Sequence, residues 1–173
     1  MSSEKIPFSK WLAKKFNVSV QDMSKTKFPR LWLKFTGAHA IAVKKKYVYV
    51  RDLAGLPEDK LWVLLVHEIC RHICRQRRIT WTLFLVRYAL SQRFRRDEEI
   101  NAFSYTMEAY YIQGKNISTL PGQIAAVLDD VYLLSDKHAK HAEKKLTERV
   151  AKIKSGEFSE VRKLRDQWRR ETI

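Results

Sequence analysis

The sequence lacks several features that mark common classes of protein. No stretch of its 173 residues reaches the roughly 18 uncharged residues that a membrane span needs. The first residues, MSSEKIPFSKW, have no apolar segment of the secretory-signal type. The chain has no glycine-rich phosphate loop, no GxSxG nucleophile elbow and no internal repeat. We therefore expect neither a transmembrane protein nor a secreted one.

Cysteine is scarce as well. Only Cys70 and Cys74 occur, four residues apart in one expected helix, where their side chains are poorly placed for an unstrained disulfide. We interpret them as reduced thiols, which indicates a cytoplasmic or other non-oxidising location.

Positive charge, in contrast, is abundant. Lys and Arg number 34 against 19 Asp and Glu, which gives a net charge of +15. Such an excess favours an acidic partner, either nucleic acid, an anionic membrane or an acidic protein surface, although it can also serve only solubility. With 45% hydrophobic residues, the chain can still form a core of its own.

The hydrophobic pattern predicts an α+β fold, with a small antiparallel sheet packed on a mainly helical body. Strands are expected at 31–36 and 39–50, the second range forming a hairpin that turns near Lys44–Lys46. Pro57 opens a helix that is apolar nearly all round and therefore buried. The spacing of apolar residues, together with the glycine and proline residues that interrupt the pattern, predicts helices at 5–16, 57–77, 81–91, 95–113 and 121–134.

The last part of the chain has a different composition. Residues 136–173 mix many charges with apolar stripes at helical spacing, so we divide the chain into a domain at 1–135 and a basic helical extension at 136–173. The stripes of this extension need a partner. That partner is the body of the domain, a second copy in a homo-oligomer, or a different protein in a larger assembly.

The main chemical oddity is the adjacent pair His67 and Glu68, which stands within the apolar run LWVLLVHEIC. Burial of such groups is costly unless they are hydrogen-bonded, paired or bound to a metal. A lone buried histidine is often a satisfied core residue. A buried His-Glu pair points further, because a metallopeptidase needs a metal ligand and a general base together at this place.

The order of elements around this pair resembles the zincin-like metallopeptidases of gluzincin type, in particular small proteins of bacteria and tailed phages. The resemblance covers about half of the chain, residues 31–112, and rests on the stretches GAHAIAVKKKYVYVRD, LLVHEICRH and WTLFLVRYALSQRFRRDEEINAF. It implies a zincin-like fold and a zinc site, in which His67 is the first ligand, Glu68 the general base and Glu99 the third ligand, with Glu98 as the fallback. It also implies a possible phage origin, in which case the protein would be virion-associated.

The second ligand of the HExxH motif is not where that family has it. Two histidines four residues apart lie about 40° apart around a helix and converge on one ion. That position is Arg71 here. His72 lies about 140° from His67 and points away unless a π-bulge shifts the register. Cys70, about 60° away, is the other candidate and would give a His-Cys-Glu site.

Arg71 also allows an answer without metal. A guanidinium at the metal position could pair with Glu68 or Glu99 and replace the positive charge of zinc. On this hypothesis, which we favour from the sequence, the chain is a zincin-like protein with a degraded metal site that acts as a binding or structural component. The alternative is a zinc-dependent hydrolase with a non-standard second ligand, so the cofactor is either none or zinc.

A second alternative is a basic nucleic-acid-binding protein. Arginines and aromatic residues interleave around residues 75–96, a combination that binds nucleic acid through phosphate contacts and base stacking. The aromatic residues also suit a core. The candidate contacts to nucleic acid or to another acidic partner are Arg75, Arg77, Arg78, Arg93, Arg95 and Arg96.

Overall fold

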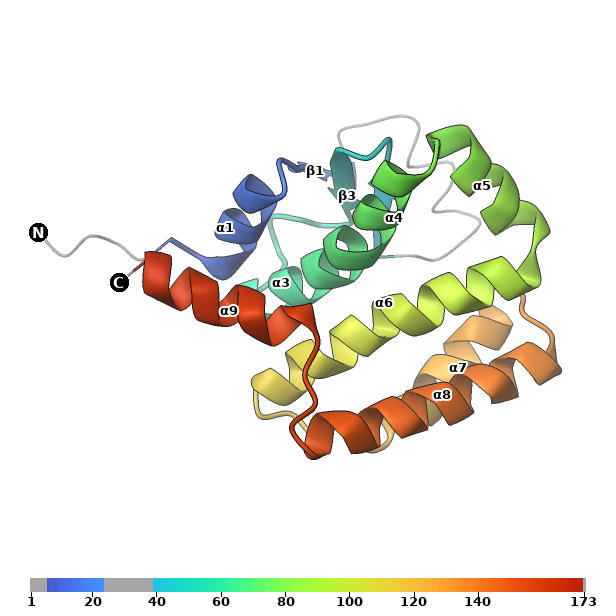
Figure 1. Ribbon diagram of the computed structural model, residues 1–173. Helices are drawn as coiled ribbons and strands as arrows, with labels where there is room; N and C mark the ends of the chain where they lie inside the picture. Colours follow the sequence, from blue (N-terminus) through green and yellow to red (C-terminus); the bar gives the residue numbers. More distant parts are fainter. Residues whose placement is uncertain (1–5, 24–38, 173) are drawn as a thin grey trace, which may run out of the picture.

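The computed structural model of the chain describes residues 6–23 and 39–172 (Figure 1). It has the expected α+β architecture, in which a small sheet lies against a mainly helical body. The strand expected at 31–36 lies outside the described residues. Within them, the helices are all too short or too polar to cross a membrane.

The sheet has three short strands, β1 (Ser19–Asp22), β2 (Ala40–Val43) and β3 (Tyr47–Val50), in the order β1-β3-β2. Strands β2 and β3 form the predicted antiparallel hairpin. Strand β1 pairs with β3 in parallel, so the sheet is mixed rather than purely antiparallel. The sequence SVQD of β1 is half-buried throughout and has no marked alternation, which is why its pattern did not predict a strand.

The hairpin turn uses two lysines in an unusual backbone conformation. Lys44 and Lys45 of the three-residue loop have φ angles of 52° and 63°, in the left-handed region that glycine or asparagine normally fills in tight hairpin turns. The buried side chain of Gln76 holds this turn. Its Oε1 accepts from the Lys45 amide at 3.1 Å and its Nε2 donates to the Ala42 carbonyl at 3.2 Å.

The central helical rod is interrupted by a π-helical turn. Helix α3 (Glu58–His67) passes into the π turn η2 (Glu68–Ile73) and then into α4 (Cys74–Arg78). Pro57 precedes the rod, and two acidic residues occupy its first turn, as predicted from the helix dipole. Strand β2 packs against η2, so the rod lies beneath the sheet.

The remaining helices surround this rod: α1 (Phe8–Lys15), α5 (Trp81–Leu90), α6 (Gln92–Ile112), α7 (Leu120–Asp130), α8 (Asp136–Lys154) and α9 (Glu160–Glu171). The long helix α6 contributes to two cores. One core contains the sheet, α1, α3 and α9, and the other contains α7 and α8 (Figure 1).

The two C-terminal helices pack on the rest of the chain. Leu146 and Ile153 of α8 and Val161 of α9 are fully buried in these cores. The buried carboxylate of Glu108 on α6 anchors the connection between α8 and α9. It accepts from Arg149 Nη2 at 2.9 Å and from the amides of Ser159 and Arg162 at 2.7 and 3.0 Å. The apolar stripes of α8 and α9 are thus covered by the rest of the same chain.

Candidate metal centre

The π turn brings together two histidines that a regular helix would separate. Hydrogen bonds from residue i to i+5 widen the turn by about one residue, so side chains five apart come onto one face. His67 closes α3 and His72 lies within η2, and their ring centroids are 5.2 Å apart. The register shift that would make His72 the second ligand is therefore present.

Helix α6 places Glu99 opposite both rings. Glu99 Oε2 lies 3.6 Å from His67 Nε2, and Glu99 Oε1 lies 3.5 Å from His72 Nε2. The candidate ligand atoms of the three residues all lie within 4.8 Å of one another. All three residues are buried, with 8%, 7% and 1% of their surface exposed for His67, His72 and Glu99. In the part of the chain that the structure describes, this is the one such group of three.

These distances suit a small divalent ion. With metal–ligand bonds of about 2.1 Å in a tetrahedral site, neighbouring ligand atoms lie about 3.4 Å apart. The two distances from Glu99, each from a different oxygen of the carboxylate, exceed that value by only a few tenths of an ångström. Glu99 Oε2 is buried and has no hydrogen-bond partner, which is costly for a carboxylate oxygen unless a cation lies beside it.

The hydrogen bonds behind His67 leave its inner nitrogen free to act as a ligand. His67 Nδ1 lies 3.1 Å from Thr106 Oγ1, and the Thr106 hydroxyl donates to the Ala102 carbonyl at 3.3 Å. Because its proton is used there, Thr106 accepts from His67 Nδ1–H, an assignment that follows from the hydrogen-bond pattern. The lone pair of Nε2 then faces Glu99 Oε2. When the ring is neutral, these two acceptors face each other and a cation between them would bind both. A histidine held through its other nitrogen is typical of metal sites.

The charges of the cluster favour the charged forms of both His67 and Glu99. Burial alone would lower the pKa of His67, but the Glu99 carboxylate, together with the charge of Glu68, raises it. Burial alone would raise the pKa of Glu99, but His72, His67 and Tyr88 hold it below its usual value. The carboxylate is thus kept ionised in a buried place, as a metal ligand must be.

Glu68 follows His67 in the chain but is not one of the three candidate ligands His67, His72 and Glu99. It is buried, with 7% of its surface exposed. Its charge contributes to the raised pKa values of His67, Tyr88 and Tyr132, so Glu68 lies near these residues. A general base beside a metal ligand is expected in the same neighbourhood.

Two tyrosines complete the surroundings of Glu99, and the sequence did not single them out for this role. The Tyr88 hydroxyl, from α5, donates to Glu99 Oε1. Tyr132, which follows α7, is half-buried, and burial together with the charges of Glu99 and Glu68 raises its pKa well above its ordinary value. Tyr88 belongs to the aromatic residues of 75–96 that the sequence assigned either to the core or to base stacking. Nothing in the spacing pointed to Tyr132, which lies 33 residues after Glu99.

Arg71 does not make the pairing expected from the sequence. Its Nη2 lies 2.8 Å from Glu98 Oε1, and Arg75 Nε approaches the same oxygen at 3.3 Å. Glu98, the fallback ligand, is therefore engaged by two arginines. Because Arg71 precedes His72 and Glu98 precedes Glu99, the pairs Arg71–Glu98 and His72–Glu99 join the same two turns of η2 and α6. The Arg71 guanidinium thus joins η2 to α6 beside the cluster of His67, His72 and Glu99, and it does not lie between these three residues.

Cys70, the other candidate for the second ligand, is not a member of the cluster. Burial, and then the charges of Cys74 and Glu108, raise the pKa of the Cys70 thiol far above its ordinary value. Since the thiolate is the form that binds metal, a thiol held protonated is a poor ligand. His72 is therefore the better candidate on both geometry and chemistry.

Comparisons of the chain with protein-family models, with curated proteins and with solved structures found no match.

Most of the arginines proposed to bind nucleic acid have contacts within the fold. Arg77 donates to the carbonyls of Lys45 and Phe16, and Arg96 pairs with Asp97 at 2.6 Å. Arg75 and Arg95 lie over the rings of Phe94 and Tyr88, at 5.7 and 6.0 Å from the centroids. Arg78 and Arg93 are the two of the six that are exposed and make no such contact. The band is thus not a continuous free basic face.

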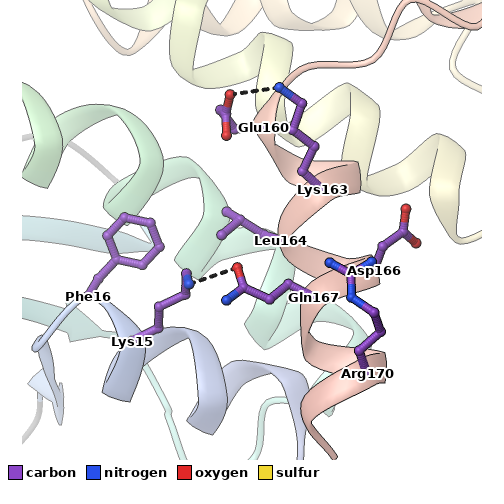
Figure 2. Close-up of a pocket in the computed structure, with 8 residues that line it drawn as sticks. All are labelled: Lys15, Phe16, Glu160, Lys163, Leu164, Asp166, Gln167 and Arg170. Atoms are coloured by element: carbon purple, nitrogen blue, oxygen red, sulfur yellow. Dashed lines mark hydrogen bonds and ion pairs between the residues drawn. The ribbon is translucent and has the colours of Figure 1, made fainter.

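A shallow groove between α1 and α9 lies apart from the histidine cluster. Figure 2 shows its lining, in which Lys15 donates to Gln167 and Lys163 pairs with Glu160. The Lys15–Gln167 hydrogen bond joins α1 to α9 across the groove, and the Lys163–Glu160 ion pair lies within α9. None of the lining residues is a ligand of the candidate centre.

Proposed function

We propose that the protein is a metal-dependent hydrolase of peptide or related amide bonds, with zinc as the ion that fits the donor set best. His67, His72 and Glu99 would hold the ion, and Glu68 would serve as the general base. The observation that carries the proposal is the convergence of three buried ligand atoms within 4.8 Å, next to a buried glutamate at the following position. The resemblance of HEICRH to the zincin motif supports the same conclusion.

The residues divide the chemistry between them. When bound, zinc supplies a Lewis acid that polarises a carbonyl oxygen and lowers the pKa of water. The Glu68 carboxylate would take the proton of the attacking water and pass it to the leaving amine. Tyr132, whose raised pKa keeps its hydroxyl protonated, would remain a hydrogen-bond donor at the site. Thr106 would hold the His67 ring in the orientation that directs Nε2 inward.

The metal-free hypothesis has less support than the sequence suggested. It needs the Arg71 guanidinium beside Glu68 or Glu99, where it would replace the charge of the ion. The Arg71 guanidinium instead pairs with Glu98 at 2.8 Å. Glu99 Oε2 therefore has no hydrogen-bond partner. We therefore favour the hydrolase over a degraded site in a binding or structural component.

The test compares zinc-loaded wild-type protein with Glu68→Gln on an unfolded, fluorescently labelled protein substrate. We expect cleavage by the wild type and a loss of about 100-fold or more in the variant, because a general base contributes on this order. Glu68→Gln should still bind one zinc ion, and the surface variant Glu148→Gln should cleave like the wild type. Cleavage that survives Glu68→Gln, or a zinc-loaded wild type without hydrolytic activity, contradicts the proposal.

A further inference from the structure

Helix α5 has two faces of different character. Its inner face carries aromatic residues that cover the metal centre, where Phe84 stacks on Tyr88 at 5.5 Å. Its outer face carries Leu83, Val86 and Leu90, which are 40%, 48% and 82% exposed. At the spacing of i, i+3 and i+7, these three form one apolar stripe. Figure 1 shows α5 at the edge of the molecule.

A second exposed leucine lies at the same end of the molecule. The Ser135 amide donates to Gln92 Oε1 at 3.2 Å and so joins the α7–α8 connection to the start of α6. Leu90 and Leu133 each lie two residues from this hydrogen bond. Leu133 is 72% exposed and has a φ of 51°, a strained conformation for leucine. The two most exposed large apolar side chains among the described residues thus belong to one region.

The charge around this region has a single sign. The sequence from 69 to 96 contains eight arginines and neither aspartate nor glutamate. Arg78 and Arg93 flank α5, and Arg87 lies on its outer face beside the apolar stripe. All three are exposed and have no acidic partner in the described parts of the chain. We define the α5 face by its apolar and basic members: Leu83, Val86, Leu90, Leu133, Arg78, Arg87 and Arg93.

We propose that the α5 face docks on an anionic lipid surface. Leucine and valine side chains would enter the boundary between headgroups and acyl chains, while the arginines would contact lipid phosphates. The combination of apolar and basic side chains fits the other candidate partners less well than it fits an anionic lipid surface. A second copy of the face would bring arginines against arginines, and the phosphates of nucleic acid would contact the arginines but leave the aliphatic stripe in water.

The test measures co-sedimentation of the full chain with two kinds of vesicle, in the presence of a chelator so that the result does not depend on the proposed hydrolase. One kind is pure phosphatidylcholine and the other contains phosphatidylglycerol in addition. We expect binding to the anionic vesicles and little to the neutral ones. The double variant Val86→Ser/Leu90→Ser should bind at least about tenfold more weakly, since each buried aliphatic side chain contributes on this order.

Two matched controls distinguish binding through the α5 face from non-specific hydrophobic adsorption and from an effect of net charge alone. Ile6→Ser removes an apolar side chain that is 50% exposed elsewhere and should bind like the wild type. Arg87→Glu and Lys10→Glu each change the net charge from +15 to +13, yet only Arg87→Glu should weaken binding strongly. Circular dichroism verifies that each variant is folded.

Three outcomes would overturn the proposal. The first is equal binding to neutral and anionic vesicles, or none to either. The second is equal effects of the α5-face variants and their controls. The third is displacement of the vesicles by single-stranded nucleic acid together with unchanged binding of Val86→Ser/Leu90→Ser, which would assign the arginines to nucleic acid instead.

Discussion

The rings of His67 and His72 lie 5.2 Å apart although the two residues are five positions apart in the sequence. The π turn η2 explains this, because it accommodates one residue more than an α-helical turn does. The segment HEICRH therefore presents its two histidines much as HExxH would in a regular helix. The additional residue changes the motif in the sequence without changing the face on which the histidines meet.

A variant that lacks Cys70 tests this explanation. Removal of one residue from η2 should close the π turn into a regular α-helix, with the flanking helices still on their present faces. We expect this variant to fold, with a circular dichroism spectrum like that of the wild type, and to bind zinc through histidines that are now four residues apart.

The matched control is a variant that lacks Leu64, in the regular part of the same rod. That deletion rotates every residue on one side of it by about 100° and should prevent folding. If both deletions unfold the protein, or both leave it folded, the π turn is not the insertion that we describe.

Glu108 should be among the most sensitive positions for stability. Its fully buried carboxylate holds Arg149 and the two amides at the start of α9. Glu108→Ala would leave the half-buried Arg149 and two backbone amides without their acceptor. Since each orphaned donor costs about 1–3 kcal/mol, we expect a loss of about 3–5 kcal/mol in the free energy of unfolding. Urea denaturation measures this loss. Glu148→Ala, which removes an exposed pairing with Lys145, should leave the midpoint nearly unchanged.

The hairpin turn offers a stabilising substitution. Lys45 has a φ of 63°, which costs a residue with a Cβ about 1 kcal/mol relative to glycine. Lys45→Gly keeps the amide that donates to Gln76 and should raise the free energy of unfolding by about this amount. Lys46, outside the left-handed region, is the control, and Lys46→Gly should not stabilise. A lower thermal midpoint for Lys45→Gly would contradict this prediction.

Much of the fold follows from patterns in the sequence. Pro57, the acidic first turn and the apolar run that follows predict the central rod, and the apolar spacing predicts the helices on either side. Strand β1 was missed because four half-buried residues carry no periodic signal. Its parallel pairing with β3 connects segments far apart in the chain, which no local pattern encodes.

The residues of the candidate site could be picked out from the sequence in part. Adjacent buried polar residues pointed to His67 and Glu68, and the resemblance pointed to Glu99. The position of His72 depended on a π turn, whose presence is decided by the packing of the rod against the sheet and α6 and not by residue propensity. The pairing of Arg71 with Glu98 rather than Glu99 likewise depends on how α6 is rotated about its axis, which only the assembled structure reveals.

The central claim, that His72 completes a metal site with His67 and Glu99, is tested most directly by zinc content after dialysis, measured by mass spectrometry on folded protein. We predict about one zinc ion per chain for the wild type and for Cys70→Ala, and almost none for His72→Ala. Zinc retained by His72→Ala and lost from Cys70→Ala, or a wild type that binds no zinc, would contradict the account.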